Sequence, residues 1–196
     1  EVLDPAEYVE LWLADAGLRG APDYGRRYDA WAGWFADQGI EAVGFGWICC
    51  RRADRDQPVV RLEDWPYEVE QPLGPQVAGW ARRTDWLAAH PDLVAERLVV
   101  GADVVQESVG APGAADPERI VLRQQRGLRR ARQVDTVEAA LVGACDGDLT
   151  VGQILAALAT LLDRDAAELP GVYLPQVTEL VEEGYLHPVG VTAADA

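Results

Sequence analysis

The chain has 196 residues, of which 49% are apolar, and its 33 acidic side chains against 17 basic ones give a net charge of −16. This composition excludes a disordered chain, which has too few apolar residues to fold, and a membrane-spanning chain, which needs long uncharged stretches. The acidic balance also argues against a generally basic nucleic-acid-binding protein.

Missing residue types restrict the possible chemistry. The chain contains no Lys, Met or Asn, one Ser, two His and three Cys. A lysine Schiff base, a zinc cluster and a Ser-His-Asp site therefore lack some or most of their parts. Cys49, Cys50 and Cys145 form no C-x-x-C pair, so we expect reduced thiols in a cytoplasmic protein and no metal site. His90 and His187 each precede a proline and are expected on the surface.

All basic residues are Arg, as in proteins from bacteria with genomes of high GC content. The sequence opens on Glu1, and no charged segment followed by an apolar one forms a secretory signal. We expect a fragment or a processed protein.

Two helices are predicted at the start of the chain. Asp4, Pro5 and Glu7 form a capping box with a proline at the first helical position, which predicts a helix over residues 5–16. An aromatic stripe at helical spacing predicts a second helix that ends before Gly39. Its members, Tyr24, Tyr28, Trp31 and Phe35, are interpreted as core or, as the less favoured alternative, as a ligand-contacting wall.

Strands are predicted next. The apolar run AVGFGWICC at residues 42–50 is typical of a buried strand, and residues 59–62 could pair with it as a hairpin. The G-x-G inside the run precedes no helix, so strand packing explains it better than phosphate binding. An amphipathic stretch predicts a connecting helix over residues 76–89, and two further strands are expected at 99–109 and 119–130 around a turn at 110–117.

The last third carries clear helix signals. Capping-box patterns at residues 135–138 and 150–153 precede apolar runs, and a third helix is predicted over 175–183 with Gly184 as its end. Residues 185–188 can begin a wing strand, and this order of elements is typical of a winged helix. We expect four segments: 1–66, a connector with two strands at 67–133, a winged-helix-like module at 134–190, and a flexible tail at 191–196.

Six arginines and no acid lie between Arg119 and Arg132, a local charge of +6. Because guanidinium groups bind phosphates in bidentate fashion, this segment is a candidate polyanion contact, although pairing with surrounding acids is the favoured interpretation. The candidate contact residues are Arg123, Arg126, Arg129 and Arg130. If one strand runs unbroken through Gly127, Arg123 and Arg129 share one face and Arg126 and Arg130 share the other.

DNA recognition by the winged-helix-like module is disfavoured. Residues 135–183 contain ten acids and one base, Arg164, so phosphates would repel the recognition helix. We expect a packing or protein-contact role instead. Two carboxylate pairs, Glu63 with Asp64 and Glu68 with Glu70, are chance pairs in so acidic a chain, and no catalytic residue is assigned.

Several runs of the sequence resemble the C-terminal half of a family of bacterial methyltransferases. These runs are DPAEYVELWLADAG, YDAWAGWFADQGIEAVGFGWICCRR, VEQPLG, VVQESVGAPGAADPERIVLRQQRGLRRARQVDT and ALVGACDGDLTVGQIL, and the resemblance covers nearly all of the chain. The family resembles class I S-adenosylmethionine-dependent enzymes related to release-factor glutamine N5-methyltransferases and small-domain ribosomal RNA methyltransferases, with a winged-helix-like tail.

The resemblance implies an α/β fold in which this chain holds the closing edge of a Rossmann-like sheet. Glu1 and Val2 would end the sixth strand, residues 4–39 would be a helical insertion, and residues 42–51 would be the antiparallel seventh strand. The family's cofactor loop, ribose-binding acid and Asn-Pro-Pro-Tyr motif are absent, so no cofactor-binding residue can be assigned.

The expected function is therefore that of the C-terminal part of an S-adenosylmethionine-dependent methyltransferase, inactive by itself. Its cofactor would be bound by the parent protein, its partner would be the missing N-terminal catalytic region, and its substrate could be protein, RNA or a small molecule. The alternative is a freestanding, non-enzymatic winged-helix interaction protein.

Overall fold

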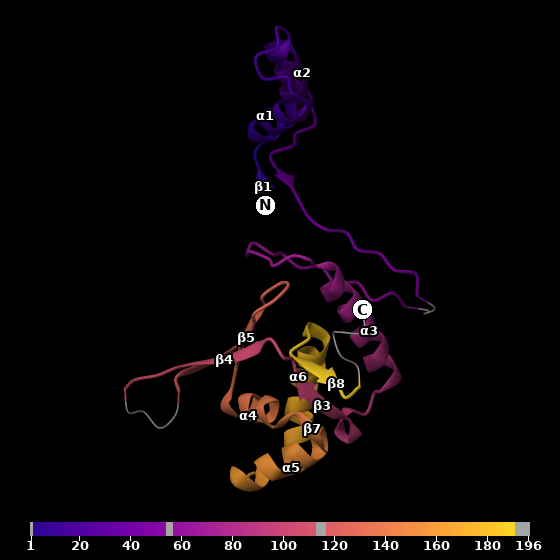
Figure 1. Cartoon of the computed structure of the whole chain (residues 1–196), viewed down its shortest axis with the longest axis vertical. Coiled ribbons are helices and arrows are strands. Elements are labelled where there is room, and N and C mark those ends of the chain that lie inside the picture. Colours follow the sequence, from indigo (N-terminus) through magenta and orange to yellow (C-terminus); the bar gives the residue numbers. More distant parts are fainter. Residues whose placement is uncertain (1, 54–56, 113–116, 191–196) are drawn as a thin grey trace. The chain divides into compact units, whose positions relative to one another are not determined.

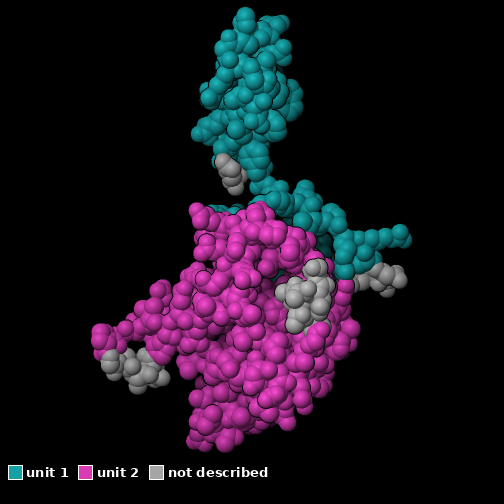
Figure 2. Space-filling model, viewed as in Figure 1, with its two compact units in different colours: residues 1–66 teal, residues 67–196 magenta. Residues whose placement is uncertain are grey.

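The computed structural model describes residues 2–53, 57–112 and 117–190. These residues form a mixed α/β structure with six α-helices and three small antiparallel sheets. The chain divides into two compact units, residues 1–66 and 67–196 (Figure 2). None of the helices in the described part of the chain is long and apolar enough to cross a membrane.

The first unit is a helical hairpin with a minimal sheet. Its elements are β1 (Val2–Leu3), α1 (Pro5–Asp15), α2 (Tyr24–Asp37) and β2 (Val43–Gly44). The predicted capping box is confirmed, because the amide of Glu7 donates to Asp4 Oδ1 at 2.9 Å while the amide of Asp4 donates to Glu7 Oε2 at 3.3 Å. β1 and β2 pair antiparallel, with Val2 opposite Gly44.

The core of the first unit is small. Val9, Leu13 and Phe35 are its buried residues, and Tyr24 and Tyr28 pack against them. The aromatic stripe is therefore core in three of its members, whereas Trp31 remains 44% exposed.

The predicted buried strand at 42–50 is wrong in length and in burial. Only Val43–Gly44 forms a strand, and Trp47 and Ile48 are 66% and 93% exposed. The hairpin partner at 59–62 is also wrong, because these residues have no regular structure. A strand exists only where a neighbour bonds its backbone, and within this unit β2 meets only the two residues of β1.

The buried residues of the second unit form one continuous core. Its elements in chain order (Figure 1) are α3 (Gly74–Ala89), the 3-10 helix η1 (Leu93–Ala95), β3 (Arg97–Val100), β4 (Val104–Val109), β5 (Arg119–Gln124), β6 (Ala131–Val134), α4 (Thr136–Ala144), β7 (Asp146–Thr150), α5 (Val151–Leu161), α6 (Leu169–Glu183) and β8 (Leu186–Pro188). Side chains from α4, α5, α6 and both sheets pack together, among them Leu98, Leu122, Leu141, Leu155 and Leu180.

The two sheets of this unit are antiparallel, with strand orders β7-β3-β8 and β4-β5-β6. The predicted strand at 99–109 is two strands in different sheets, because the chain turns between them, where the amide of Val104 donates to the carbonyl of Gly101. The expected strand at 119–130 ends at Gln124 and turns back into β6. Of the predicted turn at 110–117, residues 113–116 lie outside the described residues.

Helix ends agree well with the sequence. The reciprocal capping box of Thr150 and Gln153 is confirmed, and Gly184 ends α6 at a φ of +87°. The connecting helix is also confirmed, as α3. However, α6 begins six residues before the predicted Pro175, because Leu169 and Tyr173 are buried in the core and their burial outweighs the proline inside the helix.

Candidate functional site

The arginine-rich segment forms the β5–β6 hairpin of the second unit. Along β5, Ile120 and Leu122 are buried, whereas Arg119 and Arg123 lie on the opposite face. At the end of β5, the backbone amide of Gln124 donates a hydrogen bond to the carbonyl of Arg130 in the turn at 2.9 Å. The segment therefore presents its arginines from three places: the outer face of β5, the turn, and the inner face of β6.

Arg123 is engaged across the sheet. Its Nε lies 2.7 Å from Glu107 Oε1 and its Nη2 lies 3.1 Å from Glu107 Oε2, a bidentate pair between β5 and β4. This hydrogen bond lowers the pKa of Glu107 and raises that of Arg123. The Arg123 side chain thus has an acidic partner on its own sheet.

Arg132 lies at the centre of a larger ionic cluster on the inner side of the hairpin. Its Nε donates to Glu138 Oε1 of α4 at 3.0 Å, and its Nη1 lies 2.8 Å from Glu179 Oε2 and 3.7 Å from Glu183 Oε2 of α6. Burial raises the pKa of Glu138, although the charge of Arg132 opposes that shift. One guanidinium thus connects β6 to two helices, as expected for arginines that pair with surrounding acids.

The turn at residues 125–130 interrupts the predicted strand. Gly127 and Arg129 have φ values of +62° and +52°, so no strand alternation continues past Gln124. The predicted sharing of faces by Arg123 with Arg129, and by Arg126 with Arg130, is therefore wrong. Glycine suits position 127, because the left-handed region of backbone conformation, where φ is positive, favours glycine.

Neighbouring segments hold the turn in place. The amide of Arg126 donates to Asp103 Oδ2 at 3.2 Å, and the amide of Gln125 donates to the carbonyl of the same Asp at 2.9 Å. On the other side, the amide of Glu70 donates to the carbonyl of Gly127 at 2.7 Å. Gln76 packs so closely on Gly127 that an added Cβ would lie 2.4 Å from its Cγ.

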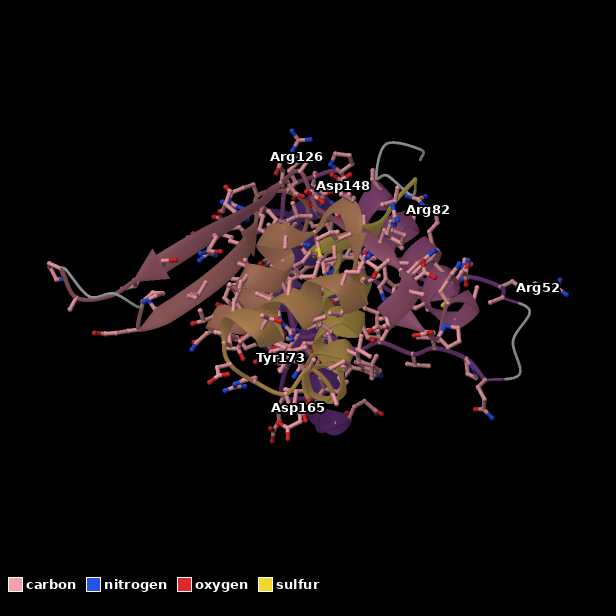
Figure 3. All side chains as sticks on the ribbon, turned by 90° about the horizontal axis from the view of Figure 1, so that it is seen from below. Arg52, Arg82, Arg126, Asp148, Asp165 and Tyr173 are labelled. Atoms are coloured by element: carbon pink, nitrogen blue, oxygen red, sulfur yellow. The ribbon has the colours of Figure 1, made fainter. Side chains whose placement is uncertain are left out.

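Two of the turn's arginines are exposed. Arg126 and Arg129 are on the surface, and among the residues that the structure describes neither side chain has an acidic partner. Figure 3 shows Arg126 projecting away from the ribbon. Arg130 is half-buried, and its positive charge acts on the buried hydroxyl of Tyr185. Of the four candidate polyanion contacts, Arg126 and Arg129 are therefore the ones displayed to solvent.

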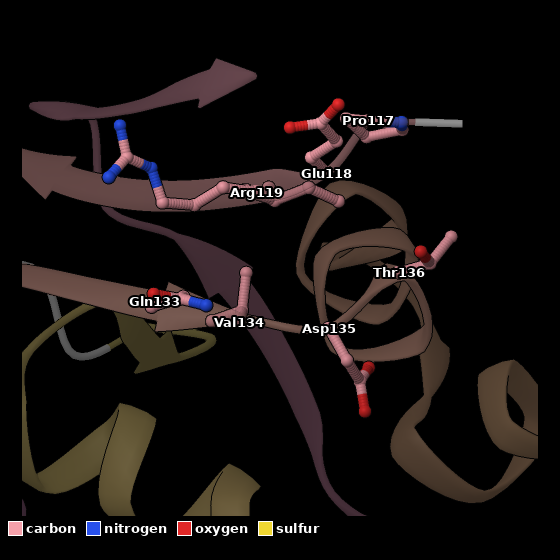
Figure 4. Close-up of a pocket in the computed structure, with 8 residues that line it drawn as sticks. Pro117, Glu118, Arg119, Gln133, Val134, Asp135 and Thr136 are labelled. Atoms are coloured by element: carbon pink, nitrogen blue, oxygen red, sulfur yellow. The ribbon is translucent and has the colours of Figure 1, made fainter. Parts of the chain in front are cut away.

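An open pocket of about 500 Å³ lies at the opposite end of the hairpin, between the start of β5 and the start of α4 (Figure 4). Its carboxylate, Asp135, accepts the amide of Glu138 at 2.7 Å and the hydroxyl of Tyr173 at 3.0 Å. This residue therefore caps α4 and anchors α6. The other polar lining residues are Glu118, Arg119, Gln133 and Thr136. Asp135, the pocket's acid nearest the helix, is thus used structurally.

Both histidines, expected on the surface, are half-buried. His187 lies within β8, where burial and the nearby Arg83 lower its pKa. His90 is half-buried, with its ring stacked on Trp86 at 4.5 Å between ring centroids and its Nδ1 2.8 Å from the Trp86 carbonyl. Within the described ranges no group of three or more His, Cys, Asp or Glu side chains is placed to hold a metal ion.

Two residues of the carboxylate pairs have described contacts. Glu63 forms an ion pair with Arg61. Glu70 contributes its backbone amide to the arginine turn instead of its side chain. Sequence reasoning missed the roles of Asp103, Gln76 and Glu70 in holding the turn, because contacts between segments far apart in the chain have no local signature. Gly127 was the only local indication of the turn.

Comparison with known proteins places the second unit in a family. Residues 78–188 match the model of a domain of unknown function, DUF7782, and the chain belongs to this family. The match runs from within α3 to the end of β8 and contains the whole arginine hairpin. No protein of curated function matches the chain.

Proposed function

We propose that this member of the DUF7782 family is the C-terminal part of a class I S-adenosylmethionine-dependent methyltransferase. In this proposal residues 1–66 complete the sheet of the catalytic domain, and residues 67–190 form an accessory, winged-helix-like domain in the bacterial cytoplasm. The sequence resemblance suggests the methyltransferase family, and the exposed apolar side chains of the first unit support it.

The observation that carries the proposal is the apolar surface of the first unit. Val9, Leu13 and Phe35 are its buried residues, whereas Trp34, Trp47 and Ile48 are 56%, 66% and 93% exposed. Exposed apolar surface of this extent marks an interface, because covering it with another surface is favourable by about 25 cal/mol per Å².

The strand pairing agrees with this assignment. The resemblance implies that the sixth strand ends at Val2 and that the seventh lies antiparallel beside it, and β1 and β2 pair antiparallel. A two-stranded ladder of this size is not stable by itself in water. Further strands supplied by a catalytic region would satisfy its free edges.

The arrangement of the second unit is compatible with a winged-helix-like domain. Three helices, α4, α5 and α6, pack beside the β7-β3-β8 sheet, and β8 follows α6 directly. DNA recognition through α6 is not part of the proposal, since Glu179 and Glu183 on this helix pair with Arg132 and its surface bears no compensating base.

The described residues do not fit S-adenosylmethionine. Gly44 ends the two-residue strand β2 and Gly46 lies in the irregular chain after it, whereas a cofactor loop must join a strand to a helix N-terminus. Methyl transfer by in-line attack of a substrate nucleophile would therefore depend on cofactor-binding residues of the catalytic region, and this chain would contribute sheet edge and accessory domain.

The alternative, a freestanding interaction protein, is supported by the second unit alone. Its core joins helices and both sheets, and the family match lies entirely within it. An interaction domain of this kind would need no catalytic sheet. The two proposals differ in what they expect of the first unit.

Calorimetric titration with S-adenosylmethionine tests the assignment. The 196-residue chain should show no binding, whereas a protein extended upstream to include a glycine-rich loop and an Asn-Pro-Pro-Tyr motif should bind it. Binding by the short chain with a Kd of roughly 1 μM to 1 mM, an ordinary enzyme–substrate affinity, would contradict the proposal. An upstream reading frame without these motifs would favour the alternative.

Sedimentation of the short chain tests the apolar surface. We expect self-association that decreases in the double variant W47S/I48S. The matched control is L161S, which removes a side chain that is 80% exposed in the second unit and should leave association unchanged. A clean monomer with slow hydrogen exchange at residues 42–50 would show that this surface needs no partner.

A further inference from the structure

We infer that the β5–β6 turn, residues 125–130, is a binding site for the phosphodiester backbone of a nucleic acid, with Arg126 and Arg129 as its contact residues. This inference stands on the geometry of the second unit and does not depend on the methyltransferase proposal.

The first step distinguishes the arginines that pair with an acidic side chain from those that do not. Arg123 and Arg132 have carboxylate partners at 2.7 and 3.0 Å. Arg126 and Arg129 are exposed, and within the described parts of the chain no acid pairs with either side chain. After these pairs are formed, Arg126 and Arg129 bring two positive charges to the turn, and the exposed Arg119 lies away from it at the start of β5.

The second step is the rigidity of the turn. Its backbone is bonded to Asp103 on one side and to Glu70 on the other, and Gln76 packs against Gly127. A turn held by three separate segments presents its guanidinium groups with a reduced entropic cost on binding. The Asp103 carboxylate accepts the Arg126 amide, so it lies toward the backbone of the turn.

The third step is the conformation of Arg129. Its φ of +52° lies in the left-handed region, which disfavours residues with a side chain, and glycine or asparagine would be accommodated there more easily. A strained residue on an exposed turn points to a functional constraint. We therefore attribute the arginine at this position to contact between its guanidinium group and a ligand.

Phosphate is the chemistry that fits these groups. Hot spots of protein–protein interfaces combine Arg with aromatic side chains such as Trp and Tyr, whereas the exposed side chains of this turn are Gln125, Arg126 and Arg129, with no aromatic among them. Arginine contacts to phosphate need only charge and hydrogen-bond donors. Because the chain carries a net charge of −16, contact is restricted to a few phosphates near the turn and weakens steeply with salt.

Fluorescence anisotropy with a short labelled single-stranded RNA, and with DNA of the same sequence, tests the site across a salt series. The wild-type chain should bind both at low salt if the backbone is recognised, or RNA alone if the 2′-hydroxyl contributes. The variant R126Q/R129Q should reduce the slope of log affinity against log salt by about 1.4. With equal affinities at about 1 M salt, this difference makes the variant bind roughly 60-fold more weakly than wild type at about 50 mM salt.

Two further variants make the result decisive. R97Q/R164Q removes two exposed arginines elsewhere in the same unit and should leave the slope unchanged. R129G accommodates the positive φ, so it should unfold at a higher temperature than wild type and still lose affinity. The inference is overturned if no nucleic acid binds at low salt, if R129G binds as tightly as wild type, or if polyglutamate competes as well as RNA.

Discussion

Replacing Arg132 by Met should expose the cost of an unpaired acid in the core of the second unit. Methionine keeps much of the side-chain length but lacks the guanidinium group that forms ion pairs with Glu138, Glu179 and Glu183. The Glu138 side chain is only 8% exposed, whereas that of Glu179 is 58% exposed and returns to solvent easily. The penalty therefore falls mainly on Glu138.

The magnitude follows from this burial. Breaking a fully buried ion pair from one side costs about 3 to 5 kcal/mol of stability. Since Arg132 keeps 19% of its exposure, we expect a loss near or below the lower end, about 2 to 3 kcal/mol. The double variant R132M/E138Q should recover most of the loss, because a neutral amide requires less compensation than a carboxylate.

The loss should also depend on pH with a definite sign. Burial already raises the pKa of Glu138 in the folded protein, and removal of Arg132 removes an interaction that lowers it. A raised folded-state pKa favours the folded protein below the ordinary pKa of glutamate, and that contribution disappears as the pH rises through the folded-state value. The R132M deficit should therefore be largest at neutral pH and decrease in acid.

Urea unfolding followed by far-UV circular dichroism, at neutral and acidic pH, measures both effects. The matched control is R123M, since Arg123 also pairs with a glutamate but both side chains are more than a third exposed. Its loss should be much smaller, as for other surface ion pairs. Equal losses for R132M and R123M, or an R132M deficit that does not vary with pH, would refute the reasoning from burial.

Two more outcomes follow from packing in other places. G127A should destabilise the protein by about 1 to 2 kcal/mol, because alanine disfavours a φ of +62° and its Cβ would meet Gln76. In a thermodynamic cycle with Q76A, the double variant should lose less stability than the sum of the two single losses. Cys49 and Cys50 are exposed and should react with a thiol reagent in the native protein, whereas Cys145, whose burial raises its pKa to about 12, should react only after denaturant is added. Rapid labelling of all three thiols in the native protein would contradict the burial of Cys145.

The elements best predicted from the sequence are those whose signals are local. The capping interactions of Asp4 with Glu7 and of Thr150 with Gln153 involve residues three apart, so the sequence alone determines them. The end of α6 at Gly184 is similar, since one glycine supplies the left-handed residue that follows the helix.

The strands were predicted poorly because strand formation depends on distant partners. An apolar run such as residues 42–50 has strand propensity, but in the described structure only Val43–Gly44 has a paired neighbour. The same limit explains why one predicted strand at 119–130 is a hairpin. Pairing of Arg123 with Ala131 on β6 requires a reversal whose only local signal was Gly127.

The arginine segment shows why composition located a candidate site without identifying its contact residues. Its six arginines are equivalent in a charge count, but the fold directs them to different environments. Arg132 lies inward among the carboxylates of α4 and α6, and Arg123 is paired across the sheet. Arg126 and Arg129 occupy a turn whose backbone is bonded to Asp103 and Glu70. A polyanion-binding role consequently requires the turn, and substitutions at Arg123 or Arg132 would report on stability instead of binding.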